Sequence, residues 1–402
     1  MTNEQFKPAD SPVFYVALIL GMLASGVAVW DALHVAEHGL QLTNMNNQVF
    51  WGMPHVFGIF MIVAASGAVN VATIGTVFGK EAYRPRVRLS ALLGIALVAG
   101  GLAAIMLDLG RPDRLTVAMT NINLKSTFGR NSIIYPVFIL LAGLTIWVAM
   151  DRGINKFFYK SVNLATLFWR LIMTMGTGSI FGYIVARQAY HSALLPALFI
   201  AMSLAWGMAI FLIAQTIIYA RNNIELHPQL RTRFKNLLGI FIGAGLFFVL
   251  VLHLVATYYA KNLDYEYFIL FNGGVFPQLF WGGYFVLGTV LPLLLLYVPG
   301  LSAIRGSVTA AAIMVLLGGL SLMYVIVISG QVYPMDMFPG MQVSSSFFDG
   351  MIDTYTPSLS EILLSLGSVG IAFTIALAGL RVFDFVPRDD TAKLQSAGYL
   401  ND

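Results

Sequence analysis

The stretch LSALLGIALVAGGLAAIMLDLGRPDR, running from Leu89 to Arg114, decides the fold. Residues 89–107 carry no charged side chain, and a helix needs about 20 apolar residues to cross the hydrocarbon core of a bilayer. Asp108 ends the apolar run, Gly110 allows the chain to turn, and Pro112 stops the helix from continuing. The stretch therefore predicts a transmembrane helix that leaves the membrane through a rigid, charged joint.

The whole chain has the composition of a membrane protein. Of its 402 residues, 58% are hydrophobic and only 10% are charged, whereas soluble proteins carry roughly 25% charged residues. Aromatic residues reach 13% and the mean hydropathy is +0.78, which excludes a disordered chain. The net charge of +4 fits basic cytoplasmic loops and is no sign of a nucleic-acid partner. Because cysteine is absent, disulfides, iron–sulfur ligation and c-type haem attachment are excluded within this chain.

Nine further stretches resemble the first in length and hydropathy, so we expect an all-α polytopic membrane protein that forms a single transmembrane domain. The first eight spans are expected to form two four-helix bundles, with two additional helices. The predicted spans are 13–33, 53–78, 89–109, 132–150, 167–187, 194–219, 237–260, 276–298, 306–329 and 358–380.

The distribution of Lys and Arg predicts the orientation of the chain. With ten spans both termini share one side, and the loops of that side hold sixteen Lys and Arg residues against six on the other side. The positive-inside rule then places both termini in the cytoplasm, and we expect a bacterial inner membrane. Two long loops, Gly110–Asn131 and Gly330–Pro357, would face the periplasm. The second is acidic, with Asp336, Asp349 and Asp353, which suits a protein partner.

Ionisable side chains within membrane spans are costly and therefore indicate function. All but one of those in this chain fall in the predicted outer half, and Arg170, near the predicted cytoplasmic start of the fifth span, is the exception. A one-sided polar zone predicts a pocket that exchanges protons with the outside and suits a quinone, whose ring needs hydrogen-bond donors and a proton route. The outer-half residues are Asp31, His34, Glu37, His38, His55, Asp108, His253 and Glu361.

Structural interpretations of these side chains stand beside the functional one. Asp108 could simply pair with Arg111 or Arg114, and Ser358 with Glu361 has the spacing of a capping box. Arg170 could extend to the cytoplasmic interface.

The histidines have structural interpretations as well. His34 and His38 could lie solvated in the interface. His55, which follows Pro54 at a helix start, could bond loop carbonyls, and His253 could be a hydrogen-bonded core residue.

The segment Leu107-Asp108-Leu109-Gly110-Arg111-Pro112 resembles the signature of the NrfD family, the polysulfide-reductase-type (PsrC-like) integral membrane subunits. Further segments are similar to the family's helix starts and exits over nearly all the chain. Ten spans and the C-terminal pattern look most like the DsrP branch, the NrfD-type subunits of the DsrMKJOP complex of dissimilatory sulfur metabolism. The further segments are Trp51-Gly52, Phe128-Gly129-Arg130-Asn131-Ser132, Gly330-Gln331-Val332-Tyr333-Pro334 and Pro357-Ser358-Leu359-Ser360-Glu361.

The resemblance implies a quinone or quinol site near the outer face, with menaquinone or ubiquinone as exchangeable substrate and no haem or iron–sulfur cluster bound by this chain. It implies a periplasmic ferredoxin-like iron–sulfur subunit as electron partner. The DsrP branch adds a haem b membrane subunit, a cytoplasmic iron–sulfur subunit and a multihaem cytochrome c. By motif position, Asp108 and Arg111 belong to the pocket or to the docking joint, and His34, His38 and His55 are all candidates for the family's outer histidine.

The leading hypothesis is a quinone-reactive subunit of a membrane-bound oxidoreductase complex, surrounded by membrane lipids and without a metal site of its own. Asp108, His55 and His34 are the expected catalytic residues. A secondary transporter or proton channel is the alternative, and a haem b cytochrome that uses His55 and His253 is a weaker one. The expected ligand-binding residues are His38, Arg111, Arg130, Asn131, His253 and Glu361.

Overall fold

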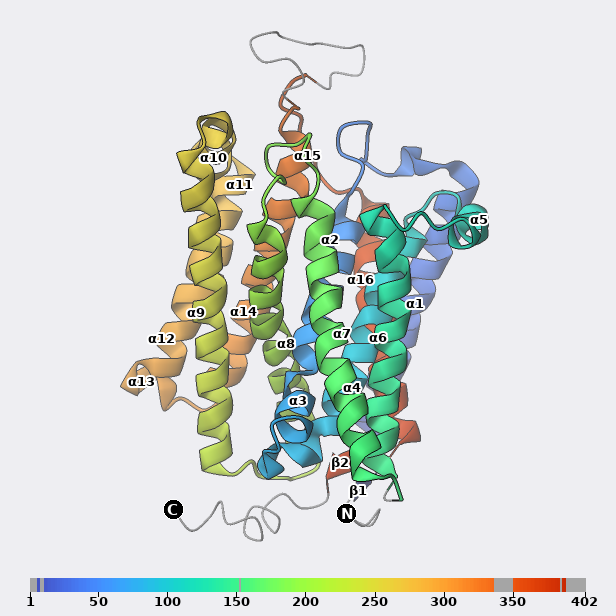
Figure 1. Ribbon diagram of the computed structural model, residues 1–402, viewed down its shortest axis with the longest axis vertical. Helices are drawn as coiled ribbons and strands as arrows, with labels where there is room; N and C mark the ends of the chain where they lie inside the picture. Colours follow the sequence, from blue (N-terminus) through green and yellow to red (C-terminus); the bar gives the residue numbers. More distant parts are fainter. Residues whose placement is uncertain (1–5, 8–10, 152, 336–349, 384, 388–402) are drawn as a thin grey trace.

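The computed structural model describes residues 6–7, 11–151, 153–335, 350–383 and 385–387. In this part of the chain, ten helices are long and apolar enough to cross a membrane, as predicted. They run side by side along the long axis of the molecule (Figure 1). The ten spans are Pro12–His38, Met53–Thr76, Glu81–Leu107, Thr127–Met150, Lys156–Gly182, Leu194–Arg221, Pro228–Tyr258, Val275–Tyr297, Ser307–Val332 and Leu359–Val382.

The first bundle consists of spans two to five. The second span comprises α2 (Met53–Ala68) and α3 (Asn70–Thr76), the third comprises the 3-10 turn η3 (Glu81–Arg86) and α4 (Val87–Leu107), and α6 (Thr127–Met150) and α7 (Lys156–Gly182) follow. Helix α2 packs on α4, α4 on α6, α6 on α7, and α7 returns to α2, which closes the bundle.

The second bundle consists of spans six to nine. It contains α8 (Leu194–Arg221) and α9 (Pro228–Tyr258), then an eighth span of α11 (Val275–Pro277), the π-helical η6 (Gln278–Val290) and α12 (Leu291–Tyr297). The ninth span comprises α14 (Ser307–Tyr324), the π-helical η7 (Val325–Ser329) and α15 (Gly330–Val332). Helix α8 packs on both α9 and α14.

The remaining two spans, α1 (Pro12–His38) and α16 (Leu359–Val382), pack on each other and on α4. The prediction of two bundles plus two helices is thus confirmed, but the assignment of the first eight spans to the bundles is wrong: the first and tenth helices are the extra pair. The two ends of the chain lie together: α1 packs along α16, and beyond them strand β1 (Phe6–Lys7) pairs antiparallel with β2 (Val386–Pro387). We call the end of the molecule that holds β1 and β2 the terminal end, and the opposite end the distal end.

The two bundles join where α2 meets α8, and glycine makes this contact close. A Cβ added at Gly67 would lie 1.6 Å from the carbonyl oxygen of Ser203, and one at Gly207 would lie 2.0 Å from the backbone nitrogen of Ala68. Small residues let transmembrane helices approach closely. Such close packing matters in a membrane, because apolar lipid offers no hydrophobic force to hold helices together. The second span is accordingly the most buried of the ten: 89% of the residues in its apolar 18-residue stretch lie inside the molecule.

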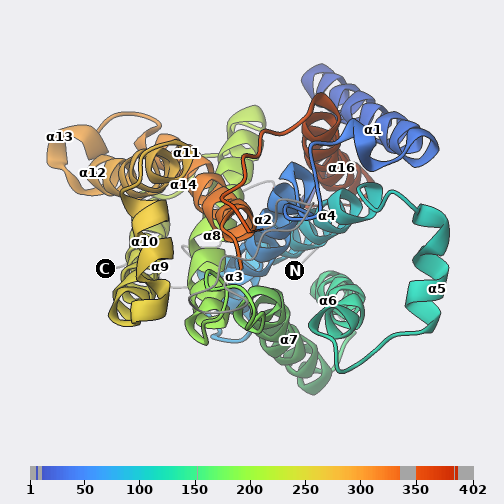
Figure 2. The same ribbon diagram turned by 90° about the horizontal axis from the view of Figure 1, so that it is seen from above.

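Short helical segments connect the spans. At the distal end lie η2 (Leu40–Leu42), η4 (Pro112–Arg114), α5 (Leu115–Thr120), η5 (Ala260–Asn262) and α10 (Leu263–Leu270), and α13 (Pro299–Ser302) precedes α14. Seen from the distal end, α5 lies apart from α4 and α6, the two helices of the first bundle that it connects (Figure 2).

Three segments differ from their predicted bounds. Helix α6 begins at Thr127, so Arg130 and Asn131 belong to a helix and not to the long loop before it. Helix α7 begins at Lys156, well before the predicted start at residue 167. In the loop of residues 330–357, Gly330–Val332 still belongs to the ninth span, and Asp336 and Asp349 lie outside the described residues.

Candidate functional site

A histidine and a carboxylate meet at the distal end of the first bundle. His55 lies in the first turn of α2, directly after Pro54, which is well suited to the start of a helix. Asp108 is the residue that caps the C-terminus of α4. Because α2 and α4 run in opposite directions and pack together, these two positions face each other, and Nδ1 of His55 lies 3.0 Å from Oδ2 of Asp108.

The acidic partner of His55 is deeply buried. Asp108 is only 4% exposed, and its Oδ1 has no hydrogen-bond partner among the described residues. The suggested pairing of Asp108 with Arg111 or Arg114 is therefore replaced by a pairing with His55. Arg111 turns outward and forms two hydrogen bonds to Asp113, at 3.0 Å each. This exposed guanidinium holds the pKa of Asp113 below its ordinary value.

A large cavity adjoins the histidine. It has a volume of about 410 Å³ and lies between α2, α4, α5 and α6, with Ile180 of α7 closing it. Its walls are mostly apolar, and its size is within the range of roughly 300–1,000 Å³ that small-molecule sites occupy. The apolar side chains around it include Ile59, Leu102, Ile105, Met106, Leu109, Leu115, Met119 and Phe128.

Polar surface is a small part of this cavity's wall, and the polar side chains in it include His55 and Asn131. His55 lines it, and because Asp108 occupies Nδ1, the other ring nitrogen Nε2 is the one left for a ligand. Asn131 also lines it; its Nδ2 donates to the carbonyl of Gly176, and its buried Oδ1 has no partner among the described residues. Such a cavity can hydrogen-bond a flat, otherwise apolar molecule at two points and can exchange a proton with it at His55.

Aromatic rings fix the orientation of His55. The Trp51 ring lies parallel to the imidazole within 25°, with 6.3 Å between ring centroids, and it also contacts Phe128 and Phe181. Trp51 is held in turn by Gln331, whose Oε1 accepts from the Trp51 backbone N–H and whose Nε2 donates to its carbonyl. The second bundle thus positions the start of α2.

Glu361 connects three segments near this site. The predicted capping box is present: the Ser358 hydroxyl accepts from the Glu361 backbone, and the Glu361 carboxylate accepts from the Ser358 backbone. The same carboxylate accepts from the backbone of Asn44 and from the hydroxyl of Tyr355. Glu361 is fully buried and close enough to Asp108 to interact with it electrostatically. Its contacts make it a structural anchor beside the site.

The first helix places its histidines elsewhere. His34 and His38 lie one turn apart on α1, with ring centroids 4.2 Å apart, and Trp30 stacks on His34. Neither histidine is among the residues that line the 410 Å³ cavity. Asp31 is buried and accepts a hydrogen bond from the Ser360 hydroxyl, which ties α1 to α16.

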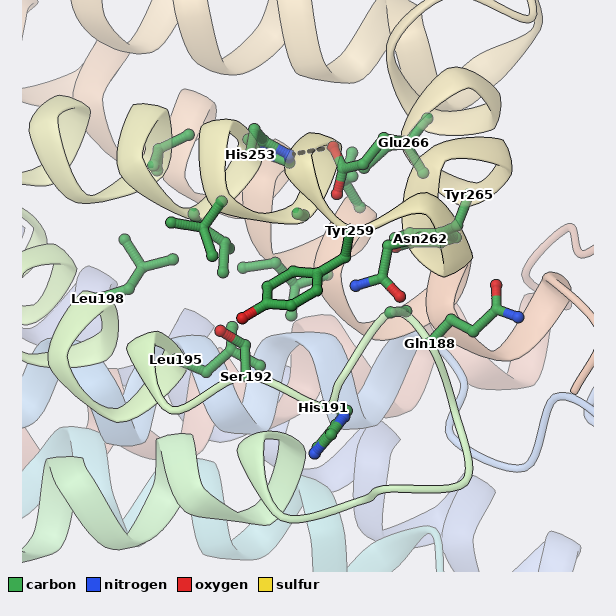
Figure 3. A pocket seen from close by; sticks show the side chains of 18 of the residues that line it. Gln188, His191, Ser192, Leu195, Leu198, His253, Tyr259, Asn262, Tyr265 and Glu266 are labelled. Carbon is green, nitrogen blue, oxygen red and sulfur yellow. Dashed lines mark hydrogen bonds and ion pairs between the residues drawn. The ribbon is translucent and has the colours of Figure 1, made fainter. Parts of the chain in front are cut away.

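His253 belongs to a different cavity in the second bundle. Its Nδ1 lies 2.7 Å from Oε2 of Glu266, which is buried in α10. The cavity beside this pair has a volume of about 70 Å³, enough for roughly two waters and too small for a ring system. Figure 3 shows His253 facing Glu266 at its rim, with Tyr259 projecting into it. His55 and His253 therefore sit in separate bundles, each beside its own carboxylate, and do not face each other.

Two further basic residues lie apart from both cavities. Arg130 is exposed on α6. Arg170 is 5% exposed in the middle of α7, where its guanidinium donates to the carbonyl of Ser66 at 2.9 Å. The prediction that Arg170 extends to the interface is wrong, because the helix begins earlier than hydropathy indicates.

Sequence reasoning missed several buried polar residues, among them Glu266, Gln331 and Arg187. Glu266 follows Asp264 in a short segment between two apolar spans, and this pair of acids is the sequence feature that could have identified Glu266. The basic Arg187 is grouped with the loop cations by its position in the sequence, yet it is 8% exposed and donates to the carbonyls of Gln48, Gly330 and Gln331. Burial lowers the pKa of this guanidinium below its ordinary value.

The fold and the site together define a polytopic helical membrane protein with a histidine–carboxylate pair beside an apolar cavity at its distal end. Residues 41–335 match the family described as "Polysulphide reductase, NrfD", and the chain belongs to this family.

Proteins similar to this chain are named as components of reductases or oxidoreductases. The integral membrane subunit of an Hdr-like menaquinol oxidoreductase from Archaeoglobus fulgidus is 26% identical over 393 residues, which cover 96% of this chain and 98% of that protein. The C subunit of the selenate reductase from Mesobacillus selenatarsenatis is 25% identical, with 87% of this chain and 89% of that protein covered. The C component of the polysulfide reductase from Wolinella succinogenes is 25% identical, with 71% and 96% covered.

Proposed function

We propose that this chain is the quinone- or quinol-reactive membrane subunit of a multi-subunit redox complex. The observation that carries the proposal is the 410 Å³ cavity with the His55–Asp108 pair at its wall. The cavity has the size and the apolar lining that a quinone ring needs, and polar surface is a small part of its wall. The name of the Archaeoglobus relative, a menaquinol oxidoreductase subunit, favours menaquinol over other quinols.

The polar groups of the cavity match the two oxygens of a quinol. Nε2 of His55 accepts the proton of one hydroxyl, and the Asp108 carboxylate stabilises the resulting imidazolium, since a neighbouring negative charge favours the protonated form. Oδ1 of Asn131 accepts a hydrogen bond from the other hydroxyl. Oxidation of the quinol releases two protons and two electrons. His55 takes one proton, and the proton of the hydroxyl at Asn131 passes to water at the distal end, since an amide does not take up a proton. The protons leave toward the distal end, and the electrons pass to the iron–sulfur clusters of a partner subunit, because this chain has no cysteine to ligate a cluster.

The remaining parts of the proposal concern placement and partners. Both termini lie in the cytoplasm of a bacterial inner membrane, and the distal end faces the periplasm, in keeping with the excess of Lys and Arg in the loops of the terminal end. A periplasmic ferredoxin-like subunit docks over α5 and the neighbouring loops. Sulfur metabolism, with the haem b, cytoplasmic iron–sulfur and multihaem cytochrome c subunits, is the proposed setting. His34, His38, Arg111 and Arg130 would serve docking or proton exit, since they do not line the cavity.

A cavity-filling variant tests the proposal. Leu102 lines the cavity from α4, and Leu102→Trp is expected to abolish labelling of the complex by a photoreactive menaquinone analogue. Leu140→Trp is the matched control, because Leu140 is 61% exposed on α6 and does not line the cavity. Undiminished labelling of folded Leu102→Trp protein would refute the proposed site.

One observation favours the alternative of a proton channel or secondary transporter. The second span is interrupted between α2 and α3, and the buried Arg170 hydrogen-bonds beside the interruption, at Ser66. Interrupted helices near the membrane centre are common at transport sites. Proton flux in proteoliposomes that hold this chain without a redox partner would favour this alternative.

A further inference from the structure

A second large cavity lies at the opposite end of the molecule from the His55 site. It has a volume of about 470 Å³ and lies between the end of α8, the beginning of α9 and the beginning of α14. These three helix ends belong to the terminal end of the second bundle. The proposed electron and proton chemistry makes no use of this cavity.

Two arginines give this cavity a positive charge. Arg231 on α9 and Arg305 before α14 both line it, and neither side chain has an ion-pair partner within the described ranges. Glu225 is the acidic residue in its lining, so the formal charge there remains positive. Guanidinium groups bind phosphate oxygens through parallel N–H donors, which makes an arginine pair suited to a phosphate group.

Gln215 supplies an independent sign of a ligand. This side chain lines the cavity from α8 and is 2% exposed, and neither its Nε2 nor its Oε1 has a hydrogen-bond partner in the part of the chain that the structure describes. A buried amide without partners is costly, and more so in a membrane protein, where lipid offers no hydrogen bonds. A molecule in the cavity with both donor and acceptor groups would satisfy it.

The beginning of α14 adds donors to the same wall. This helix of 18 residues begins after Gly306, which has φ 89°, and it has no side-chain cap. Val308 and Thr309 of its first turn line the cavity. The positive end of a helix dipole and the free N–H groups of a first turn attract phosphate.

Most of the remaining lining is apolar, and an apolar wall favours a lipid over a free anion. Leu212, Leu226 and Phe234 form much of the remaining wall. We propose that this cavity binds an anionic phospholipid. The phosphate lies between Arg231, Arg305 and the start of α14, the glycerol and ester groups reach Gln215, and an acyl chain lies on Leu212.

Lipid competition on the full chain, purified with the subunits that accompany it, tests this proposal. After delipidation in neutral detergent, native mass spectrometry should show retention of dimyristoylphosphatidylglycerol over dimyristoylphosphatidylcholine. Arg231→Gln and Arg305→Gln should each weaken retention of phosphatidylglycerol roughly fivefold, the usual contribution of one basic residue. Glu225→Gln should strengthen it, because the one acidic side chain of the lining loses its charge.

Arg221→Gln is the matched control, because Arg221 ends α8 without lining the cavity, and retention should not change. Equal retention of the two lipids, or wild-type retention in both cavity arginine variants, would overturn the proposal. Displacement of phosphatidylglycerol by inorganic phosphate at equal concentration would also overturn it, since the site would then bind a free anion.

Discussion

Nδ1 of His55 lies 3.0 Å from Oδ2 of Asp108, across the interface between the antiparallel helices α2 and α4. The carboxylate of Asp108 is buried, and the imidazole of His55 borders the cavity. The pair therefore joins a side chain that can meet a ligand to an acidic group inside the protein. A carboxylate in this position fixes the orientation of the imidazole and leaves Nε2 facing the cavity.

Asp108→Asn should therefore lower quinol oxidation by the assembled complex roughly 100-fold, the lower range for loss of a positioned proton-transfer group. Asparagine keeps the shape but removes the charge that stabilises an imidazolium. The measurement is steady-state turnover with a soluble menaquinol analogue. Asp151→Asn is the control, because Asp151 is exposed just beyond the opposite end of α6, away from the cavity. Wild-type turnover in Asp108→Asn would show that the Asp108 carboxylate takes no part in proton transfer.

Gly52→Ala should destabilise the distal end. A Cβ at Gly52 would lie 2.0 Å from Oε1 of Glu361 and 2.8 Å from the hydroxyl of Tyr355, so the anchor around Glu361 must shift. Overpacking of this kind costs about 1–3 kcal/mol, and we expect a lower Tm in a thermal unfolding assay in detergent. In the control Gly143→Ala the new Cβ meets nothing within 4 Å, so Tm should hold or rise. Equal Tm values for the two variants would show that the anchor is loose.

Hydropathy predicted the ten spans and could not predict the contacts among polar side chains. Lys156 and Lys160 are polar residues in the first turns of α7, so the apolar pattern begins only near residue 167 and misplaces Arg170. Hydropathy marks where a helix meets lipid, not where the helix begins. Arg111 is nearer than His55 to Asp108 in the sequence, yet packing between α2 and α4 decides the partner. Such a long-range pairing needs the helix order, which one sequence does not supply.

Arg187→Lys should loosen the distal loops without unfolding the helices. The guanidinium of Arg187 donates to the carbonyls of Gln48, Gly330 and Gln331, and the single ammonium of lysine cannot reach all three in that geometry. Buried carbonyls then lose their donors. Hydrogen exchange should become faster in residues 46–52 and 330–335 and stay unchanged in α9. Lys261→Arg, a change at a loop cation in η5, is the control. Unchanged exchange in both loops would contradict this role.

Ser90→Ala should destabilise the first bundle at the interruption of the second span. The Ser90 hydroxyl from α4 accepts from the backbone N–H of Ala72 at 3.0 Å and donates to the carbonyl of Ala68 at 2.6 Å. In a regular helix those two backbone groups would bond to each other, so the hydroxyl is inserted into the bond. Its removal leaves both groups without a partner in a buried region, at a cost of about 1–3 kcal/mol.

The measurement is the midpoint of denaturation, with Ser321→Ala as the control. Among the described residues, the Ser321 hydroxyl bonds only to the carbonyl of Leu317 in its own helix. We expect a lower midpoint for Ser90→Ala alone. The close contact of Gly67 with α8 opposes straightening of the second span. The N–H of Ala72 is therefore not expected to form a direct bond with the carbonyl of Ala68. An unchanged midpoint would mean that α2 and α3 close into one regular helix when the serine is removed, and that the interruption is imposed by Ser90 and not by packing against α8.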